Sequence, residues 1–171
     1  RQLEAKTYPS VDPTVAITSS LQYDADGRVR FSTDAMDRVT EFVYDARGNL
    51  TEQIAADGTS TRLAYDANGN LIRQTDELGR VTNSVYDTRN RVIATVFADG
   101  ASERIRYTGT GEVAGTRDAL DQGTSFTYDA AGRLLSTTNA LDYSAENEYD
   151  QLGRLIASID YEGHRTEFKY D

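Results

Sequence analysis

The residues of this chain that could do chemistry are its many aspartates and tyrosines and a single histidine, His164. A Ser-His-Asp triad needs these residue types, but serine and aspartate are so plentiful here that their presence does not indicate one. Paired carboxylates for glycoside hydrolysis could be drawn from any of the 28 acidic residues, and no pair stands out. We therefore expect His164 to be a surface turn residue. No catalytic residue is predicted, and the protein is not expected to be an enzyme.

The aspartates and tyrosines could also bind ligands such as metal ions or sugars. Neither the nine-residue Gly-Gly-x-Gly-x-Asp calcium repeat nor the EF-hand spacing occurs. The chain has no Cys for a thiolate metal site and no Trp, the commoner platform for sugars. The stretch Gly109-Thr110-Gly111 is not followed by a predicted helix, so it is not a phosphate loop. The sequence therefore predicts no metal and no cofactor. The aspartates are expected to cap turns, and the tyrosines to pack between successive hairpins.

A repeat of 21 residues organises the chain. Tyrosine recurs at this spacing without slippage, Asp follows it in all copies except the one with Thr108, and Gly usually stands four residues after the Tyr. A fixed period near 20 residues indicates a repeat architecture. The positions predicted to define the structural repeat are Tyr23, Asp24, Gly27, Tyr44, Asp45, Gly48, Tyr65, Asp66, Gly69, Tyr86, Asp87, Tyr107, Gly111, Tyr128, Asp129, Gly132, Leu134, Tyr149, Asp150, Gly153, Leu155 and Tyr170.

Each repeat carries two turn signals. The first is Asp-x-x-Gly directly after the Tyr, as in Asp129–Gly132, and a similar signal follows about ten residues later. The Asp can accept a hydrogen bond from the backbone two residues on, and the Gly can take the positive φ of a type I turn with a G1 bulge. A three-residue loop of this kind would place Tyr128 opposite Leu134 and Asp129 opposite Arg133.

Turn signals at this spacing are typical of an all-β protein. The strand before each Tyr alternates, with Thr61, Leu63 and Tyr65 on one face, which predicts one buried and one wet face. Since side chains alternate with a period of two, an odd repeat requires either two loops of different parity or one bulge per repeat. We expect an array of antiparallel β-hairpins, two strands per repeat and roughly fourteen or fifteen strands, that must curve and coil.

Residues 1–22 fit the repeat poorly and are expected to form an irregular lead-in or a degenerate half repeat, with Pro9 and Pro13 in a loop or edge segment and Ile17–Tyr23 as a strand. Residues 23–171 are expected to hold seven repeats and the start of the next. Because Tyr170-Asp171 opens another copy, we expect the chain to belong to a longer array. The repeats are 23–43, 44–64, 65–85, 86–106, 107–127, 128–148 and 149–169.

Charge and hydropathy exclude two classes of partner. The formal net charge of −10 argues against nucleic acid, because phosphate binding requires clustered Lys and Arg. No apolar run reaches the length of about 18 residues that a membrane-spanning helix needs. We therefore expect neither nucleic-acid binding nor a membrane span.

The motif Tyr-Asp-x-x-Gly-Arg-Leu resembles the Rhs or YD repeat. Residues 65–87 and 128–150 match it nearly throughout, and the resemblance covers about 23–171. The family comprises bacterial Rhs and other polymorphic toxins, the C components of insecticidal toxin complexes, and animal teneurins. The resemblance implies a β-sheet that spirals into a hollow shell, which in the bacterial members encloses a C-terminal toxin domain. The family's Asp-Pro-x-Gly self-cleavage element is not matched by Asp12-Pro13, so no catalytic residue is carried over.

On this resemblance the chain is expected to be a structural shell segment of a secreted or surface-delivered Rhs-type toxin protein. Its partners would be neighbouring repeats of the same polypeptide and the enclosed C-terminal toxin domain. Bare sheet edges invite pairing, so the isolated segment is expected to self-associate edge to edge. The alternative is a cell-surface adhesion or glycan-binding repeat module. A β-propeller would need a superperiod of two repeats, which the sequence does not show.

Overall fold

The computed structural model describes residues 4–8 and 17–171, with side chains from residue 19 onward. Every regular element within these residues is a β-strand, so the predicted all-β class is confirmed. The strand Ile17–Tyr23 is present, and it pairs with a strand at Glu4–Tyr8 that was not predicted. Pro9 and Pro13 lie outside the described residues. Within those residues no helix is present that could span a membrane.

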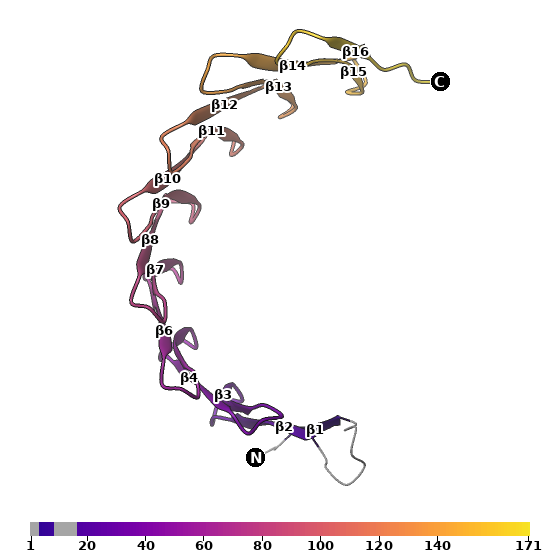
Figure 1. The fold of residues 1–171 in the computed structure, drawn as a ribbon. Coiled ribbons are helices and arrows are strands. Elements are labelled where there is room, and N and C mark those ends of the chain that lie inside the picture. Colours follow the sequence, from indigo (N-terminus) through magenta and orange to yellow (C-terminus); the bar gives the residue numbers. More distant parts are fainter. Residues whose placement is uncertain (1–3, 9–16) are drawn as a thin grey trace. The chain divides into compact units, whose positions relative to one another are not determined.

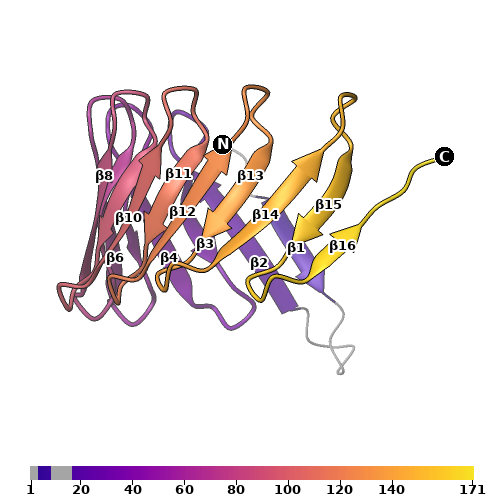
Figure 2. The same ribbon diagram turned by 90° about the horizontal axis from the view of Figure 1, so that it is seen from above.

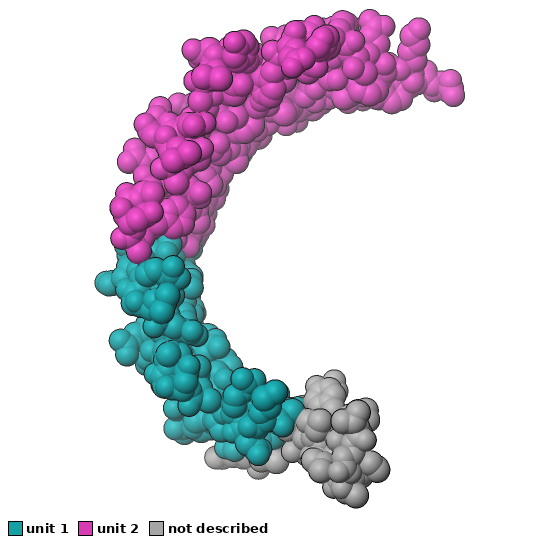
Figure 3. Space-filling model, in the orientation of Figure 1, with its two compact units in different colours: residues 1–83 teal, residues 84–171 magenta. Residues whose placement is uncertain are grey.

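The chain divides into two compact units, residues 1–83 and 84–171, and the boundary falls inside one strand, β8 (Figure 3). The strands of the first unit are β1 (Glu4–Tyr8), β2 (Ile17–Tyr23), β3 (Val29–Thr33), β4 (Val39–Tyr44), β5 (Leu50–Ile54), β6 (Ser60–Tyr65) and β7 (Leu71–Thr75), followed by β8 (Val81–Tyr86). Those of the second unit are β9 (Val92–Val96), β10 (Ser102–Tyr107), β11 (Val113–Arg117), β12 (Gly123–Tyr128), β13 (Leu134–Thr138), β14 (Ser144–Tyr149), β15 (Leu155–Ile159) and β16 (Arg165–Glu167).

Within each unit the strands follow chain order, and each pairs antiparallel with the next (Figures 1 and 2). Taken by itself, each unit is a bent single layer (Figure 3). The only hydrophobic side chain that is fully buried among the described residues is Ala157. The side chains on the face that was predicted to be buried are therefore more exposed than expected. Phe42, Leu63 and Tyr65 are only half-buried, because neighbours in the sheet are all that cover them.

A bulge next to the tyrosine resolves the odd period, which is one of the two alternatives that the sequence left open. Tyr128 lies opposite Leu134, but Thr127 lies opposite Ser136, so Leu135 has no partner across the hairpin. The same shift stands next to Tyr23, Tyr44, Tyr65, Tyr107 and Tyr149, whereas the strand pairs on the other side of each repeat keep a regular register. The bulge returns every repeat's tyrosine to the same face of its strand pair.

The two loops of each repeat are built alike. In the β12–β13 loop the Asp129 N–H donates to the Arg133 carbonyl (3.0 Å) and the Gly132 N–H to the Asp129 carbonyl (3.0 Å). The β13–β14 loop closes in the same way, with Asp142 at the position of the glycine. Asp142 has a φ of 62° and Gly132 a φ of 78°. The turn thus requires the left-handed region, which Gly adopts freely and Asp and Asn tolerate.

Candidate functional site

The β8–β9 loop shows how a first turn is assembled from its Asp. Asp87 Oδ1 accepts hydrogen bonds from the backbone N–H groups of Arg89 (2.8 Å) and Arg91 (3.0 Å). Its other oxygen, Oδ2, accepts from Nε (2.9 Å) and Nη2 (2.7 Å) of Arg91. Asn90 supplies the positive φ of 60°. One carboxylate therefore closes the turn and fixes the guanidinium of Arg91 in a forked ion pair.

The fixed guanidinium reaches the next hairpin. The Cζ atom of Arg91 lies 3.9 Å from the ring centre of Tyr107, which ends β10, and its Nη1 donates to the Gly111 carbonyl (3.2 Å). The Tyr107 hydroxyl donates to the carbonyl of Val92, the first residue of β9 (3.1 Å). The regular β9–β10 ladder begins only at Ala94, so this hydroxyl bonds a carbonyl that lies beyond the ladder.

We call this set of Asp, Arg, Tyr and carbonyl the hairpin lock, because it joins one hairpin to the next. The tyrosine bond recurs with a constant separation of 15 residues. It joins Tyr44 to Val29 (2.9 Å), Tyr107 to Val92 (3.1 Å), Tyr128 to Val113 (2.9 Å), Tyr149 to Leu134 (3.0 Å) and Tyr170 to Leu155 (2.7 Å). Arginine covers the ring in four copies, as Arg28 over Tyr44, Arg91 over Tyr107, Arg133 over Tyr149 and Arg154 over Tyr170.

In copies where another residue replaces the arginine, that residue still forms a hydrogen bond with the side chain at the first position of the turn. Asn49 donates through Nδ2 to Asp45 Oδ2 (3.0 Å), with its backbone N–H on Oδ1. In the copy without Asp, Thr108 takes the backbone N–H groups of Gly111 (3.0 Å) and Glu112 (3.1 Å) on its hydroxyl oxygen, and that hydroxyl donates to the Glu112 carboxylate. In this copy the first residue of the turn donates and the fifth accepts, which is the reverse of the Asp–Arg pair in the other copies. The turn keeps its shape.

The hydrogen bonds of the first turns favour the charged form of each Asp. The pKa of the Asp87 carboxyl is lowered, first by the side-chain hydrogen bond from Arg91 and then by the backbone N–H of the same residue. The pKa of Asp129 is lowered chiefly by the backbone N–H of Arg133. Desolvation opposes these shifts but is outweighed. The pKa values of Asp24, Asp45, Asp66 and Asp150 move in the same direction.

The second turns form a row of exposed loops. Most are capped by an Asp or Asn at the first turn position, whereas Asp57 and Asp99 cap from the third position, where they accept a hydrogen bond from the backbone N–H two residues on. His164 lies in one of them, exposed as expected, with Nδ1 3.1 Å from Asp160 Oδ2. Within the part of the chain that the structure describes, no three or more acidic or histidine side chains are placed to hold a metal ion. Nothing in this row departs from turn capping.

The lock contains many of the predicted repeat positions, and only part of its arrangement was predicted from the sequence. The pairing of Tyr128 with Leu134 and the Asp129–Arg133 ion pair were predicted and are confirmed. The tyrosine bond to the preceding hairpin and the arginine stacked on the ring were missed. The available signal was the constant spacing of 16 residues from Arg28 to Tyr44 and from Arg91 to Tyr107.

Comparison with protein families finds one match, to the family described as Teneurin YD-shell, over residues 2–171. A search of curated proteins found no match.

Solved structures of toxin complexes share the fold. The chain is similar to the Tc holotoxin pore of Photorhabdus luminescens, with a TM-score of 0.66 and 20% identity over 84% of this chain and 9% of that one. It is similar to a TcdB2–TccC3 complex without its hypervariable C-terminal region, with a TM-score of 0.68 and 19% identity over 94% and 10% of the two chains. The chain thus spans about a tenth of the length of these proteins. At such identities the likeness shows the fold.

Removing one lock hydroxyl should weaken the sheet measurably. Tyr107→Phe leaves the ring under Arg91 but takes the donor from the Val92 carbonyl. We expect the free energy of unfolding to fall by about 0.5–1.5 kcal/mol, the usual net value of such a bond. Denaturant titration followed by circular dichroism measures it. Tyr143→Phe is the matched control, because Tyr143 is 56% exposed in a second turn and should tolerate the change. Equal effects of the two variants would contradict the lock.

The ion pair of the lock should show in the pH dependence of stability. Because the pKa of Asp87 is lowered in the folded state, its contribution is present above the unfolded value of about 3.9 and is lost as the pH falls through the folded value. Asp87→Asn keeps an oxygen for both backbone N–H groups, as Asn139 does in its turn, but loses the charge. The difference in unfolding free energy between wild type and Asp87→Asn should be largest near neutral pH and shrink below about pH 4. A difference that is constant with pH would refute this origin.

Proposed function

Because the chain belongs to the teneurin YD-shell family, we propose that it forms part of the wall of a hollow shell that encloses a C-terminal toxin domain. The observation that carries the proposal is the construction of the sheet as a single layer of hairpins locked to one another, in which Ala157 is the only fully buried hydrophobic side chain among the described residues. A layer of this kind suits a wall. It separates two spaces without needing a second sheet or covering helices.

The mechanism is steric and kinetic. A wall whose backbone groups are bonded from strand to strand leaves no free edge along its length by which another polypeptide could enter. The cargo would stay isolated from the producing cell until the shell opens on delivery. In this proposal no residue of the segment performs a reaction, and its partners are neighbouring repeats of the same polypeptide and the enclosed domain. The whole protein would be secreted or delivered to the cell surface.

The proposal can be tested by limited proteolysis of the full-length protein. Trypsin should leave the repeats and the C-terminal domain protected together, as judged by mass spectrometry of the fragments, until denaturant opens the shell. Tyr107→Phe should lower the denaturant concentration at which the C-terminal domain is digested, and Tyr143→Phe should not. Digestion of the C-terminal domain in the absence of denaturant would overturn enclosure. Saturable sugar binding that scales with repeat number would then favour the adhesion module.

We also propose that the isolated segment pairs edge to edge. Among the described strands β16 is hydrogen-bonded only to β15, so its outer backbone groups face no neighbour (Figure 2). An open edge of this kind templates a further strand. Sedimentation velocity should show concentration-dependent dimers, and Glu167→Pro, which removes a backbone donor on the outer edge of β16, should reduce them. A strictly monomeric segment at high concentration would contradict the proposal.

A further inference from the structure

A cluster of like charges stands on one face of the second unit. Arg104 and Arg106 lie on β10, and Arg117 lies on β11 directly opposite Arg104. Arg106 lies opposite Gly115, so the register puts all three arginines on the same face. Like charges directly across a strand pair are destabilising. In a chain of net charge −10, this concentration of positive charge is an exception.

Two other arginines on the same face of their strands are neutralised by a glutamate on a nearby strand. Arg62 pairs with Glu52 (2.9 Å), and Arg165 pairs with Glu148. Arg104 instead faces Ala94 on its other side. Among the described residues neither Arg104 nor Arg106 forms an ion pair, and Arg117 has only Asp121 (2.9 Å), which is 80% exposed. We call the three residues Arg104, Arg106 and Arg117 the arginine patch.

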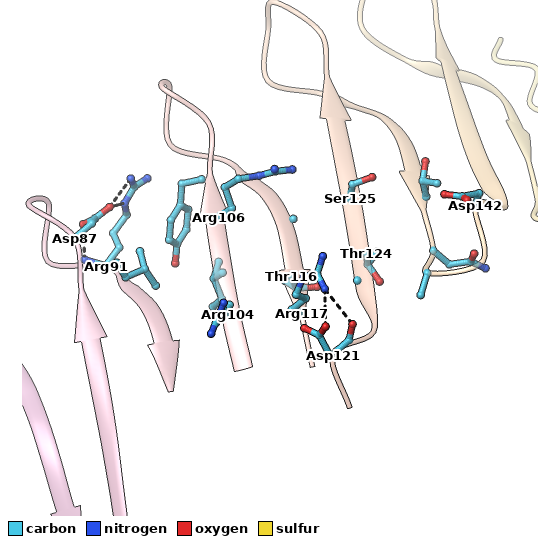
Figure 4. Close-up of a pocket in the computed structure, with 18 residues that line it drawn as sticks. Asp87, Arg91, Arg104, Arg106, Thr116, Arg117, Asp121, Thr124, Ser125 and Asp142 are labelled. Carbon is cyan, nitrogen blue, oxygen red and sulfur yellow. Dashed lines mark hydrogen bonds and ion pairs between the residues drawn. The ribbon is translucent and has the colours of Figure 1, made fainter. Parts of the chain in front are cut away.

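The patch borders a hollow in the sheet surface. Two glycines, Gly115 and Gly123, take the place of side chains beside it, and the hollow has a volume of about 810 Å³ (Figure 4). Arg106 reaches across Gly115, with its Nη2 3.5 Å from the Ala114 carbonyl. Glycine in a strand interior commonly marks a place where another backbone or a ligand approaches closely.

The distance between the arginines of the patch favours one class of anionic ligand over others. Guanidinium groups bind carboxylates in a forked geometry. Arg104 and Arg106 are two residues apart on one strand, a separation of about 6.8 Å, which is also the separation of alternate side chains in any extended peptide. Arg117 adds a third guanidinium across the strand pair. The large negative charge of the whole chain disfavours a nucleic acid, whose charge is dense along its entire length.

We propose that the arginine patch binds an extended, acidic polypeptide segment whose carboxylates are two residues apart. The peptide runs along β10, with successive carboxylates on Arg104 and Arg106. This goes beyond the role of a wall segment. The binding belongs to the second unit alone, and it requires no closed shell.

Fluorescence anisotropy with a labelled eight-residue peptide of alternating Glu and Thr tests the proposal on the chain itself. Arg104→Gln should weaken binding by about tenfold or more, as expected for loss of a charged hydrogen bond. Arg73→Gln is the matched control. Arg73 lies on the same face opposite Ala64 and Asn83 and also has no ion pair among the described residues. Its diagonal neighbour on that face, Arg62, is neutralised by Glu52, so Arg73 belongs to no cluster of unpaired arginines. The control should change the affinity by less than about twofold, the limit set by loss of one distant charge.

Two further measurements separate loss of binding from loss of folding and test the spacing of the carboxylates. Arg104→Gln should raise the denaturant midpoint, since it removes the repulsion with Arg117, so lost binding cannot be ascribed to misfolding. A peptide with Glu at every third position should bind more weakly than the alternating one. Equal loss of binding in Arg73→Gln and Arg104→Gln, equal affinity for the two spacings, or tighter patch-dependent binding of a sulfated saccharide or of DNA would each overturn the proposal.

Discussion

The sheet depends on a hydrogen bond that recurs in five copies of the repeat, from a tyrosine hydroxyl to a backbone carbonyl 15 residues earlier. A single layer has no core, so cohesion must come from neighbours within the layer. The regular ladder between successive hairpins covers only three residue pairs, as in β9 and β10, and stops short of the bulged end. There the carbonyl of Val92 would be left to water. The Tyr107 hydroxyl donates a hydrogen bond to this carbonyl, as a backbone N–H would in a longer ladder. It thereby holds the two hairpins together where they would otherwise separate.

The Asp–Arg ion pair of the lock orients the tyrosine ring whose hydroxyl makes this bond. Asp87 spends one carboxylate oxygen on the turn and the other on Arg91, and the arginine then packs on the ring whose hydroxyl makes the bond. Each element therefore positions the next, from turn to ion pair to ring to backbone. The copy with Thr108 and Glu112 shows that the turn tolerates exchange of the groups when both members change together. Exposed ion pairs alone contribute little, so their value here lies in orientation.

Much of this fold could be predicted from the sequence because the repeat multiplies weak signals. A single Asp-x-x-Gly indicates little, but seven repeats in register predicted the hairpins, the Tyr128–Leu134 pairing and the need for either a bulge or loops of different parity. Two things could not be read from it. The alternation of Thr61, Leu63 and Tyr65 is the same whether a face is covered by a second layer or by none, so the degree of burial was overestimated. The lock joins residues of different repeats, and a single-repeat motif does not show which neighbour a side chain reaches.

The bulge beside each tyrosine also governs how such a chain can change its length. Because it restores the facing of all side chains after one repeat, loss or duplication of a single unit leaves every downstream residue on its original side. A strictly alternating sheet with the same odd period would tolerate only paired changes. A sheet built in this way can therefore be lengthened or shortened one hairpin at a time without turning any later side chain to the other face. In the shell wall proposed above, each added or removed repeat would change the length of the wall by the width of one hairpin, and the enclosed volume with it.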